Sequence, residues 1–145
     1  MDCEGAALNA EFIVDASVGI AWVYQSQATP ETDHLLNQVA AGATVVVPGL
    51  WFFEMSNILL IAQRRHRLTV GQRKAAMEKL TAMQLTVDEE GTRNAFGKTS
   101  ELAEKYGLTI YDATYLELAL RRSLPLASRD EALRNAAKQC GLKAL

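Results

Sequence analysis

Four acidic residues stand in this sequence where strands are expected to end or helices to begin, and carboxylates in such positions can bind metal ions. They are Asp15, Glu54, Asp112 and Asp130. Because oxygen ligands suit Mg²⁺ and Mn²⁺, a converging set of this kind predicts a site for one of these ions. Such an ion activates a water molecule and stabilises the charge of a phosphodiester during in-line displacement. Converging carboxylates also repel one another, so the arrangement needs a divalent cation to be stable.

Each of these acids also has a purely structural interpretation. Asp15 and Asp130 could cap the helices that follow them, and Asp112 could stabilise the dipole of its helix. Glu54 differs, because it lies in an apolar helical segment and has no cation at i±3 or i±4. A buried carboxylate without a partner is costly unless it binds a metal ion, so the surroundings of Glu54 favour a functional role.

Two serines could support the acidic set, whereas the histidines are poorly placed for catalysis. Ser17 follows Asp15 by two residues and Ser128 precedes Asp130 by two, so each could orient a carboxylate or a water molecule. His34 lies in a polar stretch and His66 in a basic helix end. We expect both histidines at the surface, which gives little support to a histidine-based ribonuclease.

Short apolar runs that alternate with helical segments predict an α/β fold with a parallel sheet covered on both faces. We expect strands over 11–14, 44–47, 85–87 and 124–127, and 142–145 could form a last strand. We expect helices over 17–25, 31–41, 50–65, 69–83, 92–105, 111–122 and 130–140. Sites in such sheets form beyond the carboxyl ends of the strands. Asp15 and the segment from Ser128 to Asp130 should therefore lie on the same edge of the sheet.

The length and composition predict a single globular domain. The 145 residues suffice for one core, and the net charge of −2 gives no general sign of a nucleic-acid binder. Residues 1–10 have neither a cationic start nor an apolar stretch, and no run is long enough to cross a membrane. Cys3 and Cys140 lie far apart in the sequence, which makes a disulfide or zinc site improbable. We therefore expect a cytoplasmic protein without membrane contact.

Four segments in order carry a family resemblance. They are IVDASV (13–18), PGLWFFEMSNIL (48–59), GLTIYDATYLELA (107–119) and LPLASRDEAL (124–133). Together they resemble the PIN-domain ribonucleases, specifically the VapC-type toxins of type II toxin–antitoxin systems. The resemblance covers residues 11–145 as a single PIN domain, with residues 1–10 as an N-terminal extension.

The resemblance implies both a fold and an activity. The fold is a three-layer α/β/α sandwich with a central parallel sheet. The activity is Mg²⁺- or Mn²⁺-dependent cleavage of RNA, with Asp15, Glu54, Asp112 and Asp130 as metal-binding catalytic residues and Ser128 near them. It further implies a homodimer and a cognate antitoxin protein that covers the active-site groove and neutralises the toxin.

Several other side chains admit two interpretations. Arg64, Arg65 and Arg67, and likewise Arg121 and Arg122, could contact an RNA backbone, or could simply lie in solvated helix ends that complement the dipole. Arg129 could contact phosphate or point into solvent. Trp51 and Phe52 are expected to pack in the core, although an antitoxin-facing patch is the alternative.

Three other functions compete with the toxin. The first is a PIN nuclease that is not a toxin, and the second is a non-catalytic PIN module that binds RNA or protein, which the intact acidic set disfavours. The third is a phosphoryl-accepting receiver or haloacid-dehalogenase-like domain. A receiver has adjacent acids after its first strand and a dehalogenase-like phosphatase a DxD motif, but the sequence here is Asp15-Ala16-Ser17.

Overall fold

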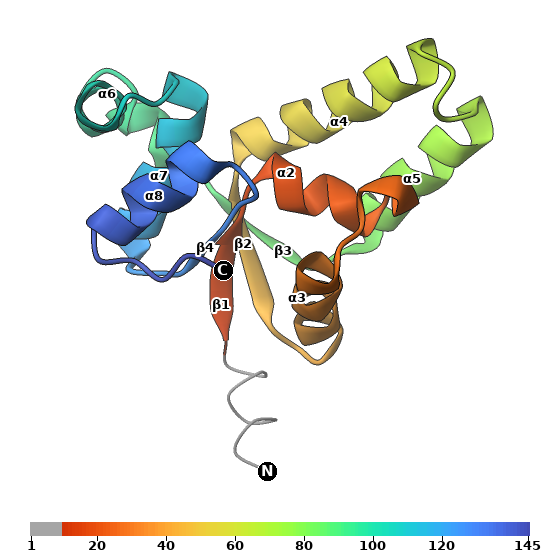
Figure 1. Cartoon of the computed structure of the whole chain (residues 1–145), viewed down its shortest axis with the longest axis horizontal. Helices are drawn as coiled ribbons and strands as arrows, with labels where there is room; N and C mark the ends of the chain where they lie inside the picture. Colours follow the sequence, from red (N-terminus) through yellow and green to blue (C-terminus); the bar gives the residue numbers. More distant parts are fainter. Residues whose placement is uncertain (1–9) are drawn as a thin grey trace.

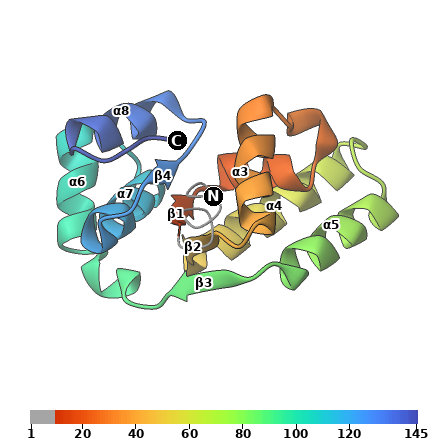
Figure 2. The same ribbon diagram turned by 90° about the horizontal axis from the view of Figure 1, so that it is seen from below.

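A computed structural model describes residues 10–145, which form a four-stranded parallel sheet between two layers of helices (Figures 1 and 2). The strands lie in the order β3-β2-β1-β4, and their bounds are β1 (Glu11–Val14), β2 (Thr44–Pro48), β3 (Leu85–Asp88) and β4 (Leu126–Ala127). The two central strands carry β-branched residues that are completely buried, such as Ile13 and Val46. Burial on both faces is the usual state of a parallel sheet, which explains their nearly continuous apolar sequences.

The helices cover the two faces of the sheet separately. Helices α6, α7 and α8 lie together on one side, and α3, α4 and α5 lie on the other (Figure 2). Their bounds are α2 (Ala16–Gly19), α3 (Pro30–Ala40), α4 (Gly49–Arg64), α5 (Val70–Ala82), α6 (Lys98–Tyr106), α7 (Ile110–Arg122) and α8 (Glu131–Gln139). The predicted α/β/α sandwich with a central parallel sheet is thus confirmed.

Two predicted helices are shorter than expected. The segment 17–25 becomes the single turn α2 followed by the 3₁₀ turns η1 (Ile20–Trp22) and η2 (Gln25–Gln27), where the Trp22 Nε1 donates to the Thr32 carbonyl at 2.9 Å. The segment 92–105 becomes the 3₁₀ turn η3 (Gly91–Asn94) and then α6. Phe96, between η3 and α6, is fully exposed. A helix through this stretch would lack the packed apolar face that stabilises most helices in proteins.

The chain end pairs with the sheet more weakly than a strand would. Leu126 and Ala144 form an isolated parallel bridge, and the Leu145 N–H donates to the Leu126 carbonyl at 2.9 Å. Because β4 has only two residues, it offers no further positions for pairing. The prediction of a last strand over 142–145 is therefore wrong beyond this bridge.

Tight packing at Trp51 fixes α4 against the first helical turn. Trp51 is 1% exposed, as expected for a core residue, and its Nε1 donates to the Asp15 carbonyl at 3.4 Å. A Cβ atom at Gly19 would lie 2.8 Å from the Trp51 ring, so only glycine allows this approach. The contact brings the second turn of α4, which carries Glu54, to the carboxyl end of β1.

Two further predictions concern the chain as a whole. No helix within residues 10–145 is both long and apolar enough to span a bilayer. The N-terminal extension, apart from Ala10, and Cys3 lie outside the described residues.

Candidate active site

Asp15 lies at the carboxyl end of β1, and hydrogen-bond donors hold both of its carboxylate oxygens. Its Oδ1 accepts from the Ser17 hydroxyl at 2.6 Å and from the Val18 N–H at 3.2 Å, while its Oδ2 accepts from the Ser128 hydroxyl at 2.5 Å. The Val18 contact makes Asp15 the N-cap of α2, so the structural interpretation of this residue is correct. However, an N-cap needs only the Val18 contact. The additional hydrogen bonds from Ser17 and Ser128 fix the orientation of the Asp15 carboxylate beyond what capping requires.

The two serines also link Asp15 to the segment that carries Asp130. The Ser17 Oγ accepts from the Arg129 N–H at 2.8 Å, and the Ser128 Oγ accepts from the Asp130 N–H at 3.0 Å. Asp130 is exposed and caps α8, since its Oδ1 accepts from the Leu133 N–H at 2.9 Å. The carboxyl ends of β1 and β4 are thus joined side by side, as the sequence predicted.

Glu54 has a partner that its own helix does not supply. The Tyr115 hydroxyl, from α7, donates to the Glu54 Oε1 at 2.5 Å. Tyr115 is buried and Glu54 half-buried. The expectation that Glu54 lacks a cation on α4 is correct, but the expectation of a carboxylate with no partner at all is wrong. The pair is 61 residues apart in sequence, which is why local spacing gave no sign of it.

Asp112 lies in the first turn of α7 without capping it. Thr109 is the N-cap, and its hydroxyl oxygen accepts from the Asp112 N–H at 3.1 Å. The Asp112 side chain is half-buried, and a hydrogen bond from the Thr109 side chain lowers its pKa against the larger opposite effect of burial. Of the structural roles considered from sequence, only dipole stabilisation remains for Asp112.

The four acids lie close enough to influence one another electrostatically. Burial raises the pKa of Asp15, most strongly opposed by its hydrogen bond from Ser128. Burial and then the charges of Asp130 and Asp15 raise the pKa of Asp112. Burial also raises the pKa of Glu54, against the Tyr115 hydrogen bond, and the charges of Asp112 and Asp15 add to the increase. Negative charge is therefore concentrated here, and within residues 10–145 no Lys, Arg or His forms an ion pair with any of the four acids.

The donor set suits a hard divalent cation, although these side chains do not form a closed cage. Among residues 10–145, no three His, Cys, Asp or Glu side chains are gathered closely enough to hold a metal ion. Mg²⁺ does not need such a cage, because it keeps several of its waters and binds through one or two carboxylates. The carboxylates offer only oxygen donors, neighbouring acids raise the pKa of Asp112 and of Glu54, and a bound cation would offset that repulsion. The residues present thus fit Mg²⁺ or Mn²⁺ with water as additional ligands.

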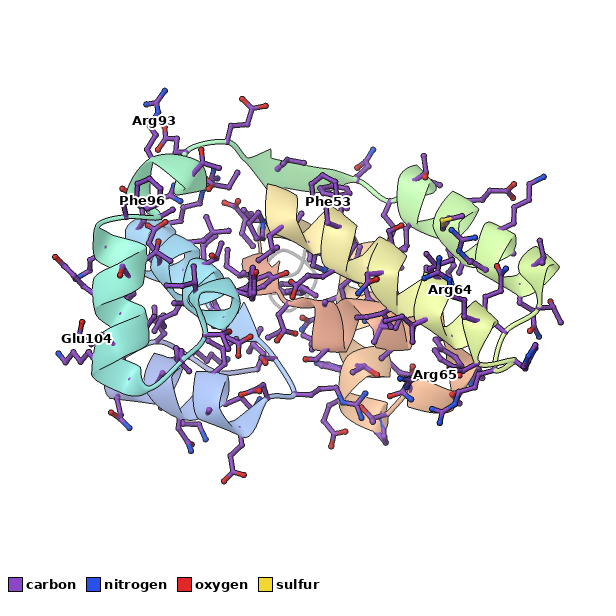
Figure 3. The ribbon with its side chains drawn as sticks, turned by 90° about the horizontal axis from the view of Figure 1, so that it is seen from above. Phe53, Arg64, Arg65, Arg93, Phe96 and Glu104 are labelled. Carbon is purple, nitrogen blue, oxygen red and sulfur yellow. The ribbon has the colours of Figure 1, made fainter. Side chains whose placement is uncertain are left out.

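Three of the arginines that could contact RNA are exposed at the surface. Arg64 and Arg65 are exposed at the far end of α4 (Figure 3). Ten residues separate Glu54 from Arg64, which corresponds to about 15 Å along a helix. Arg129 is exposed, and its Nη1 donates to the Gln27 carbonyl at 3.0 Å. Contact with RNA stays a prediction for all three arginines.

Arg121 and Arg122 belong to an ion-pair cluster that sequence reasoning missed. Arg121 donates from Nη1 and Nη2 to the two carboxylate oxygens of Asp88, each at 2.8 Å, and from Nε to Glu117 at 2.8 Å. Arg122 adds a contact to Asp88 at 3.3 Å. Asp88 and Glu117 are buried, and Arg121 lowers the pKa of Asp88 through its hydrogen bonds. Arg121 is therefore engaged by two carboxylates, whereas Arg122 is exposed in the last turn of α7, as expected for a solvated helix end.

The aromatic residues next to Glu54 differ in burial. Trp51 is in the core, and Phe52 contacts it edge to face with ring centroids 5.3 Å apart, but Phe52 is 41% exposed. Phe53, the neighbour of Glu54, is 77% exposed, and its ring stands on α4 in the view onto the carboxyl edge of the sheet (Figure 3). Tyr111, the neighbour of Asp112, is 62% exposed. Exposed aromatic residues therefore stand next in sequence to two of the four acids.

Comparison with known proteins identifies the family. Residues 12–139 match the PIN domain family, so the chain belongs to it. Members of this family are generally nucleases. A comparison with curated proteins gave no match.

Solved structures of other proteins share the fold at low sequence identity. PAE2754 from Pyrobaculum aerophilum is similar with a TM-score of 0.67 and 23% identity, covering 94% of this chain and 91% of that one. VapBC2 from Rickettsia felis, solved with a DNA fragment from its promoter, gives a TM-score of 0.63 and 12% identity over 93% and 97% of the two chains. The toxin–antitoxin protein VapBC-5 from Mycobacterium tuberculosis gives 0.53 and 20% over 94% and 98%.

Proposed function

We propose that this protein is a Mg²⁺- or Mn²⁺-dependent endoribonuclease that acts in the cytoplasm as the toxin of a toxin–antitoxin pair. The carrying observation is the group of four acids at one edge of the sheet, three of which have raised pKa values and none of which is paired with a basic side chain among the described residues. A protein keeps such unfavourable charge for function more readily than for stability. Membership of the PIN domain family supports nuclease chemistry.

The chemistry follows from what the side chains can hold and orient. Asp15, Glu54, Asp112 and Asp130 would hold the ion, which supplies an activated water and a counter-charge for the phosphodiester. Ser17 and Ser128 fix the Asp15 oxygens, and Tyr115 fixes Glu54, so these carboxylates cannot rotate away from the site. No side chain has to form a covalent intermediate, because water would attack phosphorus directly while the bond to the leaving ribose oxygen breaks and that oxygen takes up a proton.

An antitoxin partner and a homodimer are parts of the same proposal. The similar structures from Rickettsia felis and Mycobacterium tuberculosis are described as VapBC toxin–antitoxin proteins, which supports a comparable partner here. The exposed rings of Phe53 and Tyr111 beside the acids would be covered by such a partner. An arginine of the antitoxin entering the acidic cluster would be electrostatically favourable. Light scattering of the purified protein alone tests the homodimer.

Controlled expression in a bacterial host tests the toxin directly. We expect wild-type expression to arrest growth and the Asp112→Asn variant to permit it at the same protein level. Co-expression of a small antitoxin encoded next to this protein's gene should restore growth of the wild type. Normal growth with the wild type, together with RNA cleavage by the purified protein, would instead identify a PIN nuclease that is not a toxin. Normal growth with no cleavage would identify a non-catalytic binding module.

A further inference from the structure

A second concave site adjoins the acidic cluster and has no part in the function proposed so far. It is a cavity of about 590 Å³ between the start of α3 and the segment that joins β4 to α8. Two residues of its wall, Val18 and Ser128, donate hydrogen bonds to the carboxylate of Asp15. The cavity and the candidate active site therefore share a wall, and a ligand in one lies next to a ligand in the other.

The polar groups of the cavity favour an anion. Arg129 and Arg134 line it, and only their Nη1 atoms are engaged, Arg129 with the Gln27 carbonyl and Arg134 with the main-chain oxygens of Ser128 and Leu145. Within residues 10–145, the Nε and Nη2 atoms of both guanidinium groups have no hydrogen-bond partner. A guanidinium with free donors on a concave surface suits phosphate.

The volume of the cavity and its apolar lining residues favour a ligand larger than inorganic phosphate. The volume falls within the range of about 300–1,000 Å³ that is typical of sites for small organic molecules. Val18, Pro30 and Leu35 add apolar surface to the lining. Glu31 is the one acidic residue in the described lining, so the arginines outnumber it. An anionic group joined to a flat, mostly apolar ring system matches this combination.

We propose that the cavity binds one nucleoside monophosphate unit, with its phosphate at Arg129 and Arg134 and its base against the apolar wall. The unit is either a nucleotide of the RNA strand next to the cleaved bond, which rests on the proposed function, or a free nucleotide. In the first case the shape of the cavity determines which base is accepted next to the scissile bond. The β4–α8 segment then contributes to the base specificity of cleavage.

Binding of single nucleotides to the whole, metal-free protein tests the cavity independently of cleavage. We would titrate uridine, cytidine, adenosine and guanosine 5′-monophosphates, and inorganic phosphate, into ¹⁵N-labelled protein and follow the amide signals. At least one nucleotide should shift the amides of Val18, Leu35 and Arg129 in a saturable manner, and phosphate alone should bind more weakly. Shifts confined to other regions, or no shifts at all, would overturn the proposal.

Charge variants test the ligand's position. Arg129→Glu should weaken nucleotide binding about tenfold, the loss expected for one charge-assisted contact. Glu31→Gln removes the opposing charge at an exposed position and should tighten binding about twofold. Lys74→Glu changes the net charge as Arg129→Glu does, but at an exposed position on α5 that does not line the cavity, and it should leave binding unchanged. If Arg129→Glu does not fold, unchanged affinity in Glu31→Gln still counts against the proposal.

A short single-stranded RNA distinguishes the two sources of the nucleotide. The experiment uses the Asp112→Asn variant, which should not cleave RNA. If the RNA displaces the bound nucleotide, and if adding Arg129→Glu weakens RNA binding, the cavity belongs to the substrate strand. RNA that leaves the nucleotide in place assigns it to a free nucleotide. Failure of the proposed ribonuclease function would appear separately, as intact RNA incubated with the wild-type protein and Mg²⁺.

Discussion

Two groups of acidic residues lie near the carboxyl ends of the strands, and they differ in what surrounds them. Asp88, at the end of β3, and Glu117 face Arg121, which donates to both of them. Asp15, at the end of β1, is held instead by hydroxyl groups and lies near other acids. The guanidinium groups lower the pKa of Asp88, whereas burial raises the pKa of Asp15.

The difference separates stabilising charge from charge reserved for a ligand. Both carboxylates are about 5% exposed, so burial alone does not distinguish them. The Asp88 group has its cation in Arg121, while under the proposed function the Asp15 group receives its cation as a bound metal ion. We therefore expect substitutions in the first group to affect stability and substitutions in the second to affect cleavage.

The largest expected effect is the loss of cleavage in Asp15→Asn. Removing one metal-binding carboxylate should reduce the rate of RNA cleavage about 10³-fold, corresponding to about 4 kcal/mol of transition-state stabilisation. The variant should unfold at the same urea concentration as the wild type or a higher one, because an ionised group with a raised pKa destabilises the folded state. Unaltered cleavage, measured on a labelled RNA, would contradict the assignment of Asp15.

The reverse result is expected for Asp88→Asn. Loss of this anion leaves Arg121 partly unpaired and should lower the free energy of unfolding by about 2–3 kcal/mol, below the range for fully buried pairs because the Arg121 side chain is 24% exposed. Cleavage per folded molecule should stay within about twofold of the wild type. Urea denaturation measures the first quantity and a rate normalised to folded protein the second. A stable but inactive variant would remove the distinction between the two groups.

Divalent cations should stabilise the protein through the Asp15 group alone. At ten times its dissociation constant, Mg²⁺ should raise the free energy of unfolding by about 1.4 kcal/mol. Thermal unfolding with Mg²⁺ and with EDTA measures this increase. It should disappear in Asp15→Asn and persist in Asp88→Asn, whereas equal stabilisation of both variants would place the ion elsewhere.

The pH dependence of stability should have opposite signs in the two groups. In metal-free protein the raised pKa values of Asp15, Asp112 and Glu54 mean that stability falls as pH rises from the ordinary carboxyl range through the raised values. The lowered pKa of Asp88 means that its stabilisation is present above the ordinary value of 3.8 and is lost as pH falls below it. Denaturation midpoints in EDTA should therefore rise on mild acidification from neutral pH. Asp15→Asn should weaken that rise, and a rise of equal size in this variant would contradict the pKa assignment.

Much of the fold followed from local sequence, but several contacts between distant segments did not. The buried runs of β1 and β2 and the stop at Gly107, where φ is +65°, are recognisable because burial and glycine leave local patterns. The chain positions of the four acids were visible for the same reason. The Tyr115–Glu54 hydrogen bond and the Asp88–Arg121 pair were not, since each joins residues more than thirty positions apart. Arginines at the end of α7 therefore resembled an RNA contact until their partner on β3 was known.

The smallest expected effect concerns Tyr115→Phe. Loss of the hydrogen bond to Glu54 should lower stability by about 1 kcal/mol and reduce cleavage only a few-fold. Because this hydrogen bond lowers the pKa of Glu54, its removal should move the acidic limb of the pH–rate profile to higher pH. A profile that does not move would show that Glu54 does not limit the rate.

Cleavage of a labelled RNA as a function of Mg²⁺ concentration, for the wild type and for Asp112→Asn, tests the central claim most directly. Asp112 is the most informative position, because it does not cap its helix and burial and neighbouring acids raise its pKa, so its substitution should disturb the fold least. The wild-type rate should rise with Mg²⁺ to saturation and vanish in EDTA, and Asp112→Asn should remain inactive at every concentration while staying folded. Equal cleavage by the two proteins, or wild-type cleavage that persists in EDTA, would contradict a metal-dependent site built from these four acids.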